Sequence, residues 1–300
     1  MRGTVSLGYP ALFRLIQNYQ VPYRPSAALQ RLGASYFLIV ILCLLAGCGL
    51  ENRLIFHPTS DIARTPRDVG LEYQDLYFTT ADNVRLNGWF IPHPLASATM
   101  IWFHGNAGNI GDRVDNIKLL HEKIRISIFI FDYRGYGRSP GSSSEATTYL
   151  DGEAAMNFVR SQLQVESKNL LIFGRSLGAA VAAEMASRHD SRAVILESPF
   201  ASIGEMAGLM LPVVPIGPLL SAKFDVIAKV GKITAPLLVL HGDQDEIIPF
   251  EQGQRVFAAA RQPKQFYPIK GANHSDTFIA GGNGYYERLK SFIETSHQSN

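Results

Sequence analysis

The chain has 300 residues, of which 46% are hydrophobic and 18% charged, and its formal net charge is +2. This composition is typical of a folded globular protein and excludes a disordered or fibrous chain. The nearly balanced charge gives no indication of a nucleic-acid-binding surface.

Residues 1–50 differ from the rest of the chain. They contain four of the 28 basic residues and no acid, so the remainder has 24 basic against 26 acidic residues. Residues 36–46 are uncharged and mostly apolar, but fewer than the roughly 20 that cross a bilayer. This layout predicts a secretory signal segment, with an uncleaved single-span anchor as the alternative. The long stretch before it also fits a mitochondrial presequence, or a translation start assigned too far upstream.

The end of this segment, Leu45 to Cys48, resembles the lipobox of bacterial lipoproteins. The resemblance implies cleavage before Cys48, a lipid on that cysteine and, because Gly49 follows, export to the outer membrane. Cys43 and Cys48 are the only cysteines. Residues 51–300 therefore hold no disulfide, cysteine nucleophile or cysteine metal site.

Residues 51–300 are predicted to form one domain in which strands and helices alternate. A hairpin is expected over 71–79 and 84–91. Further strands are expected at 99–103, 124–131, 170–173, 193–196, 236–240 and 265–269. Helices are expected at 113–123, 144–163, 179–185, 250–260 and 285–295. Apolar strands that alternate with helices predict a mainly parallel sheet covered on both faces, with functional groups at the carboxyl ends of the strands.

A sharp turn follows the apolar run at 170–173. Gly174, Ser176 and Gly178 form G-x-S-x-G, and the alanine-rich residues after them favour a helix. Strand, turn and helix in this order are the context of a nucleophile elbow, in which glycines permit a strained turn that exposes the serine hydroxyl. Alone, the pattern also fits an ordinary glycine-rich turn, so other residues must supply the context.

Polar groups follow four predicted strands: residues 104–109, Ser176, residues 241–245 and residues 273–276. Acyl transfer by a serine needs a base to take its proton, an acid to orient that base, and N–H donors for the oxyanion. Ser176 is followed by Asp245 and then by His274, which is the serine, acid, histidine order known for an elbow of this kind.

Five motifs occur in order: FHGNAGN, DYRGYGRS, GRSLG, HGDQDEIIP and GANH. With them, about residues 73–293 resemble the serine hydrolases of the α/β-hydrolase fold, and more narrowly the Bem46-like and ABHD-type branch. The resemblance implies Ser176 as nucleophile, Asp245 as acid and His274 as base. It also implies that the backbone N–H groups of Asn106 and Leu177 bind the oxyanion.

Each assignment has an alternative. Asp243 or Glu197 are other candidates for the acid, and His297, in a polar tail, is the other histidine after the acid. His104 is expected to hold the oxyanion loop by a hydrogen bond. The glycines at 105, 108 and 111 lack the spacing and the lysine of a nucleotide site, and Asp243, Asp245 and Glu246 lack the rest of a calcium loop. No cofactor and no metal are therefore expected.

Residues 199–234, between two predicted strands, are expected to form a small apolar lid. The sequence thus predicts a serine hydrolase of the carboxylesterase, lipase or thioesterase type that works through an acyl-enzyme on a small or lipid-like acyl substrate. A serine peptidase of the same fold and a non-catalytic, lipid-anchored binding protein are the alternatives. The membrane is the expected partner of the N-terminal segment, nucleic acid is not expected, and the oligomeric state is left open.

Overall fold

The computed structural model describes residues 47–210 and 217–296. The apolar run 36–46, the central part of the predicted lid and His297 lie outside these ranges. The chain divides into two units, Met1–Gly47 and Cys48–Asn300, and the second holds all the elements below apart from the first residue of α2.

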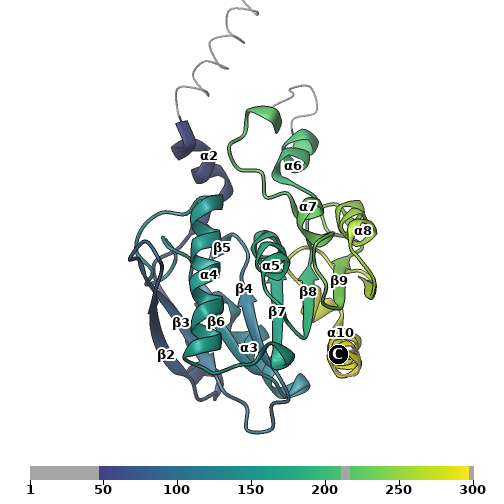
Figure 1. Ribbon diagram of the computed structural model, residues 1–300. Helices are drawn as coiled ribbons and strands as arrows, with labels where there is room; N and C mark the ends of the chain where they lie inside the picture. The colour runs from purple at the N-terminus through teal and green to yellow at the C-terminus, as the bar shows by residue number, and fades with distance from the viewer. Residues whose placement is uncertain (1–46, 211–216, 297–300) are drawn as a thin grey trace, which may run out of the picture. The chain divides into compact units, whose positions relative to one another are not determined.

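One eight-stranded sheet forms the centre of the second unit, in the spatial order β10-β9-β8-β7-β4-β6-β3-β2 (Figure 1). Its strands are β2 (Gln74–Thr79), β3 (Arg85–Ile91), β4 (Thr99–Phe103), β6 (Ser127–Phe131), β7 (Leu170–Arg175), β8 (Ala193–Glu197), β9 (Leu237–Gly242) and β10 (Lys264–Ile269). The pairs from β10 to β6 are all parallel, whereas β3 is antiparallel to both β6 and β2. The predicted mainly parallel sheet and its edge hairpin are confirmed.

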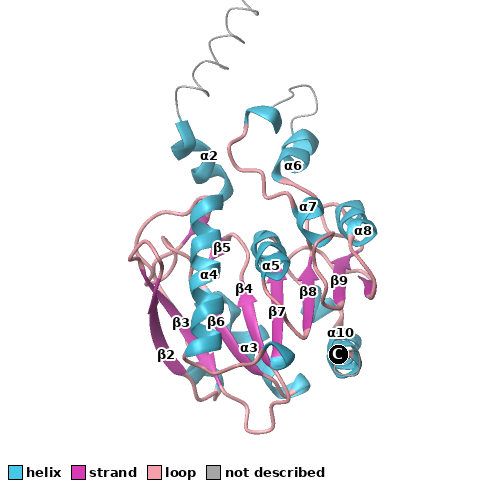
Figure 2. Cartoon of the chain, viewed as in Figure 1, coloured by secondary structure: helices cyan, strands magenta, loops and turns pink. Residues whose placement is uncertain are grey.

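Helices cover both faces of the sheet (Figure 2). One face packs against α4 (Glu145–Ser161), α5 (Leu177–Arg188), α7 (Val226–Val230) and α8 (Phe250–Ala259), and the other against α3 (Val114–Ile124) and α10 (Gly282–Thr295). A separate buried apolar cluster fills each side. Because both faces are covered, the central strands are continuous apolar runs that do not alternate with polar residues.

Some elements differ from the prediction. The strand expected from residue 124 begins at Ser127, because α3 continues to Ile124 and Arg125 ends it in the left-handed conformation at φ +63°. The predictions did not include α2 (Gly47–Ile55), which contains Cys48, or the two-residue parallel pair β1 (His57–Pro58) and β5 (Ala107–Gly108).

The segment between β8 and β9 contains α6 (Ile203–Met210), the 3-10 turn η4 (Gly217–Leu219) and α7. Figure 1 shows α6 beyond the carboxyl ends of the strands, on the side where α5 begins. Here we name residues 199–210 and 217–226 the cap. Across the described ranges, none of the helices combines the length and the apolar character needed to cross a bilayer.

Two glycines set the distance between β7, α5 and β4. A Cβ on Gly174 would lie 2.3 Å from the carbonyl oxygen of Gly178, and one on Gly178 would lie 2.0 Å from that of Phe103. Real Cβ atoms do not approach backbone oxygens so closely, so only glycine fits at both positions. The start of α5 is thereby held against the carboxyl end of β4.

Substitution of these glycines should therefore be costly. For Gly178→Ala we expect a loss of about 3 kcal/mol or more in the free energy of unfolding, because the methyl group forces α5 away from β4. Urea unfolding followed by circular dichroism measures this loss. Gly208→Ala is the matched control, since a Cβ there meets no atom within 4 Å. It should be neutral or stabilising by up to about 1 kcal/mol, and an equal loss in both variants would contradict this packing.

Candidate active site

Ser176 occupies a strained turn between β7 and α5. Its φ of +54° and ψ of −123° lie where residues with a Cβ are rarely found. The turn is held by its neighbours: Ser176 N donates to Glu197 O at 2.9 Å, and Ala179 N donates to Ser176 O at 2.9 Å. The predicted elbow geometry is therefore present at this serine.

The side chains of Ser176, His274 and Asp245 form one continuous chain of contacts. His274 Nε2 lies 3.0 Å from Ser176 Oγ, and His274 Nδ1 lies 2.8 Å from Asp245 Oδ2. His274 follows β10 and Asp245 follows β9, so three strand ends supply the three groups. A carboxylate that accepts from Nδ1–H leaves Nε2 free to take a proton from the serine hydroxyl.

Asp245 is held in its ionised form. Burial alone would raise its pKa, but hydrogen bonds from His241 and His274, the charge of His274 and the backbone N–H of Ile248 outweigh burial and bring the pKa well below its ordinary value. Oδ1 accepts from the N–H groups of Ile247 and Ile248 at 3.0 and 2.8 Å, which leaves Oδ2 to face His274. His241 also lies close, with Nε2 3.4 Å from Oδ2. The contribution of His241 was not predicted from the sequence.

The two alternative acids lie elsewhere. Asp243 Oδ1 accepts from Gly271 N at 2.6 Å and so ties together the loops after β9 and β10. Glu197 is fully buried and accepts from Thr277 Oγ1 at 2.6 Å and Tyr285 Oη at 2.5 Å. Both carboxylates hold loops around the site, and neither is among the hydrogen-bond partners of the His274 ring.

Arg175 links Glu197 to the loop of the histidine. Its Nε lies 3.1 Å from Glu197 Oε1, and its Nη2 donates to the carbonyl oxygen of His274 at 2.6 Å. The residue directly before Ser176 thus holds the backbone of the residue that must face Ser176. Nothing in the sequence indicated this role, because it depends on a contact between residues 99 positions apart.

The predicted oxyanion donors, Asn106 and Leu177, lie on two elements that the close contact at Gly178 brings together. Within the part of the chain that the structure describes, neither backbone N–H donates to another protein group. The loop of Asn106 is anchored by its other polar atoms: the side chain donates to Ile55 O at 2.8 Å, and the carbonyl oxygen accepts from Tyr136 Oη at 2.7 Å. The two N–H groups therefore remain available to a ligand.

His104 orients one of these donors. Its Nδ1 lies 2.7 Å from Gly105 O and must be the donor, since a carbonyl oxygen only accepts. In a trans peptide the C=O and the following N–H point in opposite directions, so holding Gly105 O turns the N–H of Asn106 away from His104. The hydrogen bond expected for His104 is present.

His104 and Asp132 form a buried pair beneath this loop, with Nε2 3.6 Å from Asp132 Oδ1. Burial, together with the charge of Arg113, lowers the pKa of His104 to about 3. Burial also raises the pKa of Asp132 to about 7. Both shifts favour the uncharged forms, so His104 remains a neutral donor to Gly105 over the physiological range.

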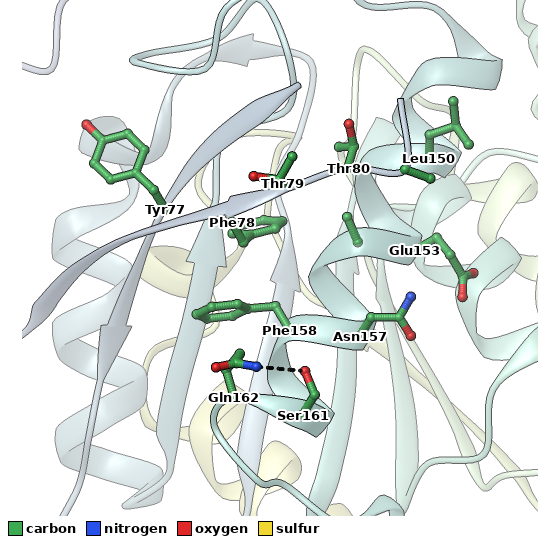
Figure 3. A pocket seen from close by; sticks show the side chains of 12 residues that line it. Tyr77, Phe78, Thr79, Thr80, Leu150, Glu153, Asn157, Phe158, Ser161 and Gln162 are labelled. Atoms are coloured by element: carbon green, nitrogen blue, oxygen red, sulfur yellow. Dashed lines mark hydrogen bonds between the residues drawn. The ribbon is translucent and has the colours of Figure 1, made fainter. Parts of the chain in front are cut away.

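An open groove of about 540 Å³ lies away from these residues, between β2 and α4. Figure 3 shows the rings of Phe78 and Phe158 close to each other, Tyr77 pointing away from them, and Glu153 and Asn157 on the other side. None of the three residues Ser176, Asp245 and His274 lines it. In the described ranges there is also no cluster of three or more histidine, cysteine or acidic side chains that could bind a metal ion.

Comparison with known proteins shows to which family the chain belongs. Residues 98–218 match the family described as the alpha/beta hydrolase fold. The chain is similar to the alpha/beta hydrolase domain-containing protein WAV2 of Arabidopsis thaliana, at 31% identity over 77% of this chain and 81% of that one. It is also similar to protein bem46 of Schizosaccharomyces pombe, at 31% identity over 76% and 79%. The solved structure of the Pyrococcus furiosus esterase Pf2001 has a similar fold, with a TM-score of 0.67 and 21% identity over 80% and 98% of the two chains.

Replacement of the acid tests the site without removing its scaffold. In Asp245→Asn the amide NH₂ would face His274 Nδ1 and force the proton onto Nε2, which then cannot accept from Ser176. We expect kcat on an activated ester to fall about 10⁴-fold, with an unchanged circular dichroism spectrum.

Asp243→Asn is the matched control, because its Oδ1 can still accept from Gly271. Its kcat should stay within about threefold of the wild type. If Asp243→Asn loses more activity than Asp245→Asn, the assignment of the acid is wrong.

Proposed function

The chain belongs to the α/β hydrolase family, and we propose that it is a serine hydrolase that cleaves carboxylic ester or thioester bonds through an acyl-enzyme. The observation that carries the proposal is the unbroken contact from Ser176 Oγ through the His274 ring to Asp245, at 3.0 and 2.8 Å. Esterases among the proteins of similar fold support the same class of reaction.

In the first half of the reaction, Ser176 Oγ attacks the carbonyl carbon of the substrate while His274 Nε2 takes the hydroxyl proton. Asp245 keeps Nδ1 protonated and stabilises the positive charge that forms on the imidazole. The N–H groups of Asn106 and Leu177 bind the oxygen on which negative charge develops. Collapse of the intermediate breaks the bond to the alcohol or thiol, which leaves with the proton from His274.

In the second half, water takes the place of the leaving alcohol. His274 removes a proton from the water as it attacks the acyl carbon, and returns a proton to Ser176 Oγ when the acid leaves. The chain supplies every acid, base and oxyanion donor in both halves, and the only other reactants are the ester or thioester and water. The buried, ionised Asp245 serves both halves, since the same positive charge on His274 appears in each.

The exposed apolar side chains of the cap favour a substrate with an apolar acyl chain. Leu209, Met210 and Leu219 expose 53%, 74% and 54% of their surface, and three of the nine exposed large apolar side chains in the described ranges thus belong to the cap. They lie on α6 and η4, elements that pack against each other. We propose that this part of the cap contacts acyl chains of lipid-like esters.

Reaction with a fluorophosphonate probe tests the serine directly, because the probe reacts with an activated serine. We expect the wild type to be labelled and Ser176→Ala not to be, with His274→Ala labelled at least about 10³-fold more slowly. Ser275→Ala, an exposed serine beside the base, is the control and should be labelled like the wild type. A folded wild type that takes no label would instead favour a non-catalytic binding protein.

We further propose that residues 1–50 direct export and hold the protein at a membrane through a lipid on Cys48. The acid-free composition and the apolar run at 36–46 support this. An uncleaved single-span anchor is the alternative.

The state of the N-terminus distinguishes the two. Mass spectrometry of the full chain expressed in a bacterium should find a lipid-modified peptide that begins at Cys48, absent in Cys48→Ser and kept in the matched Cys43→Ser. An unmodified chain in the membrane fraction that retains residues before 48 would exclude the lipid anchor.

A further inference from the structure

Four successive backbone amides of the cap are bound by two carboxylates. The N–H groups of Ser221 and Ala222 donate to Glu51 at 3.0 and 2.7 Å. Those of Lys223 and Phe224 donate to Glu145 at 2.6 and 2.8 Å. We name these four hydrogen bonds the carboxylate clamp.

The clamp supplies hydrogen-bond acceptors to backbone N–H groups that lie outside any helix or strand. Residues 221–224 lie between η4 and α7 in irregular backbone, and two of them, Ala222 and Phe224, are buried, so that their N–H groups need acceptors within the protein. A carboxylate offers two oxygens and bonds to it are charge-assisted, so each acid holds two neighbouring amides. Burial tends to raise the pKa of Glu51, but its bonds from Ser221 and Ala222 and the charge of Lys223 lower it overall.

The clamp also fixes the helix of the cap. Lys223 O accepts from Ile203 N at 3.0 Å, and Ile203 is the first residue of α6. Phe224 is fully buried against Phe56 and Tyr149, with ring centroids 6.3 and 5.8 Å apart. The position of α6 therefore depends on residues that lie far from it in the sequence.

Glu51 lies in the middle of α2, and the C-terminal end of α2 contacts the oxyanion loop. Ile55 O accepts from the side chain of Asn106 at 2.8 Å, and His57 N donates to Asn106 O at 3.0 Å. One helix of nine residues thus binds the cap through Glu51 and the loop of a proposed oxyanion donor through Ile55. Residues of α2 thus contact both the cap and the loop of Asn106, which are far apart in the sequence.

We propose that Glu51 is a positioning residue that, together with Glu145, holds the cap in the arrangement that accepts long acyl chains. The proposal rests on the proposed hydrolase function, and it assigns a specificity role to a residue outside the triad. Glu51 acts through the cap backbone and touches no reacting atom.

Amide hydrogen exchange tests the clamp independently of catalysis. In Glu51→Gln of the full chain, the glutamine side chain has one acceptor oxygen where the carboxylate has two, and it has no charge. We expect the amides of Ser221 and Ala222 to exchange at least tenfold faster, with a smaller change at Lys223 and Phe224. Glu145→Gln should show the reverse pattern, and Glu72→Gln, an exposed acid before β2, should leave all four unchanged.

Kinetics with two esters tests the specificity. The wild type should have a higher kcat/KM for p-nitrophenyl octanoate than for the acetate. In Glu51→Gln we expect the ratio of kcat/KM for the octanoate to kcat/KM for the acetate to fall at least fivefold, mainly because KM for the octanoate rises. The kcat/KM for the acetate should change less than twofold. Glu72→Gln should keep the wild-type ratio.

The outcomes separate the two proposals. Unchanged exchange at residues 221 and 222 in a folded Glu51→Gln would overturn the clamp. Faster exchange together with an equal fall in kcat/KM for both esters would overturn the specificity role and leave a structural one. A wild type that hydrolyses neither ester and takes no fluorophosphonate would refute the proposed hydrolase and the specificity role together, whereas the exchange result would still decide whether the clamp holds the cap.

Discussion

The close contact of α5 with β4, which only glycine permits at position 178, is the constraint on which the site depends. It places the start of α5, with Leu177, beside the loop after β4, with Asn106. The same contact allows the strained backbone of Ser176, because the turn has no room to relax toward an ordinary conformation. The cost of that strain is offset by the burial of the surrounding strands, whose side chains are mostly apolar. The loop after β4 is thereby held against the turn of Ser176, where a Cβ on Gly105 would lie 3.5 Å from the Cβ of Ser176.

The remaining groups are held by buried charges. Glu197 at the end of β8 accepts from Tyr285 and faces Arg175, and Arg175 binds the carbonyl oxygen of His274. The ring of His274 is then oriented by Asp245, whose second oxygen is occupied by backbone N–H groups. Each loop is fixed at two points, one in the backbone and one in a side chain. Such preorganisation is what an acyl-transfer site needs, since stabilisation of the transition state depends on donors that do not have to move.

The sequence was sufficient for the sheet, because apolar runs separated by helices have few other solutions. Strand ends that a parallel sheet brings to one edge grouped Ser176 and His274 with candidate acids. The resemblance to the α/β-hydrolase motifs then pointed to Asp245 and not to Asp243 or Glu197. The sequence did not show that Arg175 holds the loop of His274, or that Glu51 and Glu145 hold the cap. Their partners are backbone atoms of distant segments, and a backbone carbonyl or N–H has no sequence signature. Glu197 illustrates the same limit: its residue type and place after β8 suit a triad acid, and only its contacts with Thr277 and Tyr285 distinguish the two roles.

The central claim is that Ser176 forms a covalent acyl-enzyme, and rapid quench of the protein with an activated ester measures this directly. Intact-mass and peptide mass spectrometry should find one acyl group per chain, on the peptide that contains Ser176, together with a burst of alcohol equal to the number of active chains. The adduct should persist longer in His274→Ala once formed, because deacylation also needs the base. Turnover of the ester with no adduct, or an adduct on any residue other than Ser176, would contradict the mechanism.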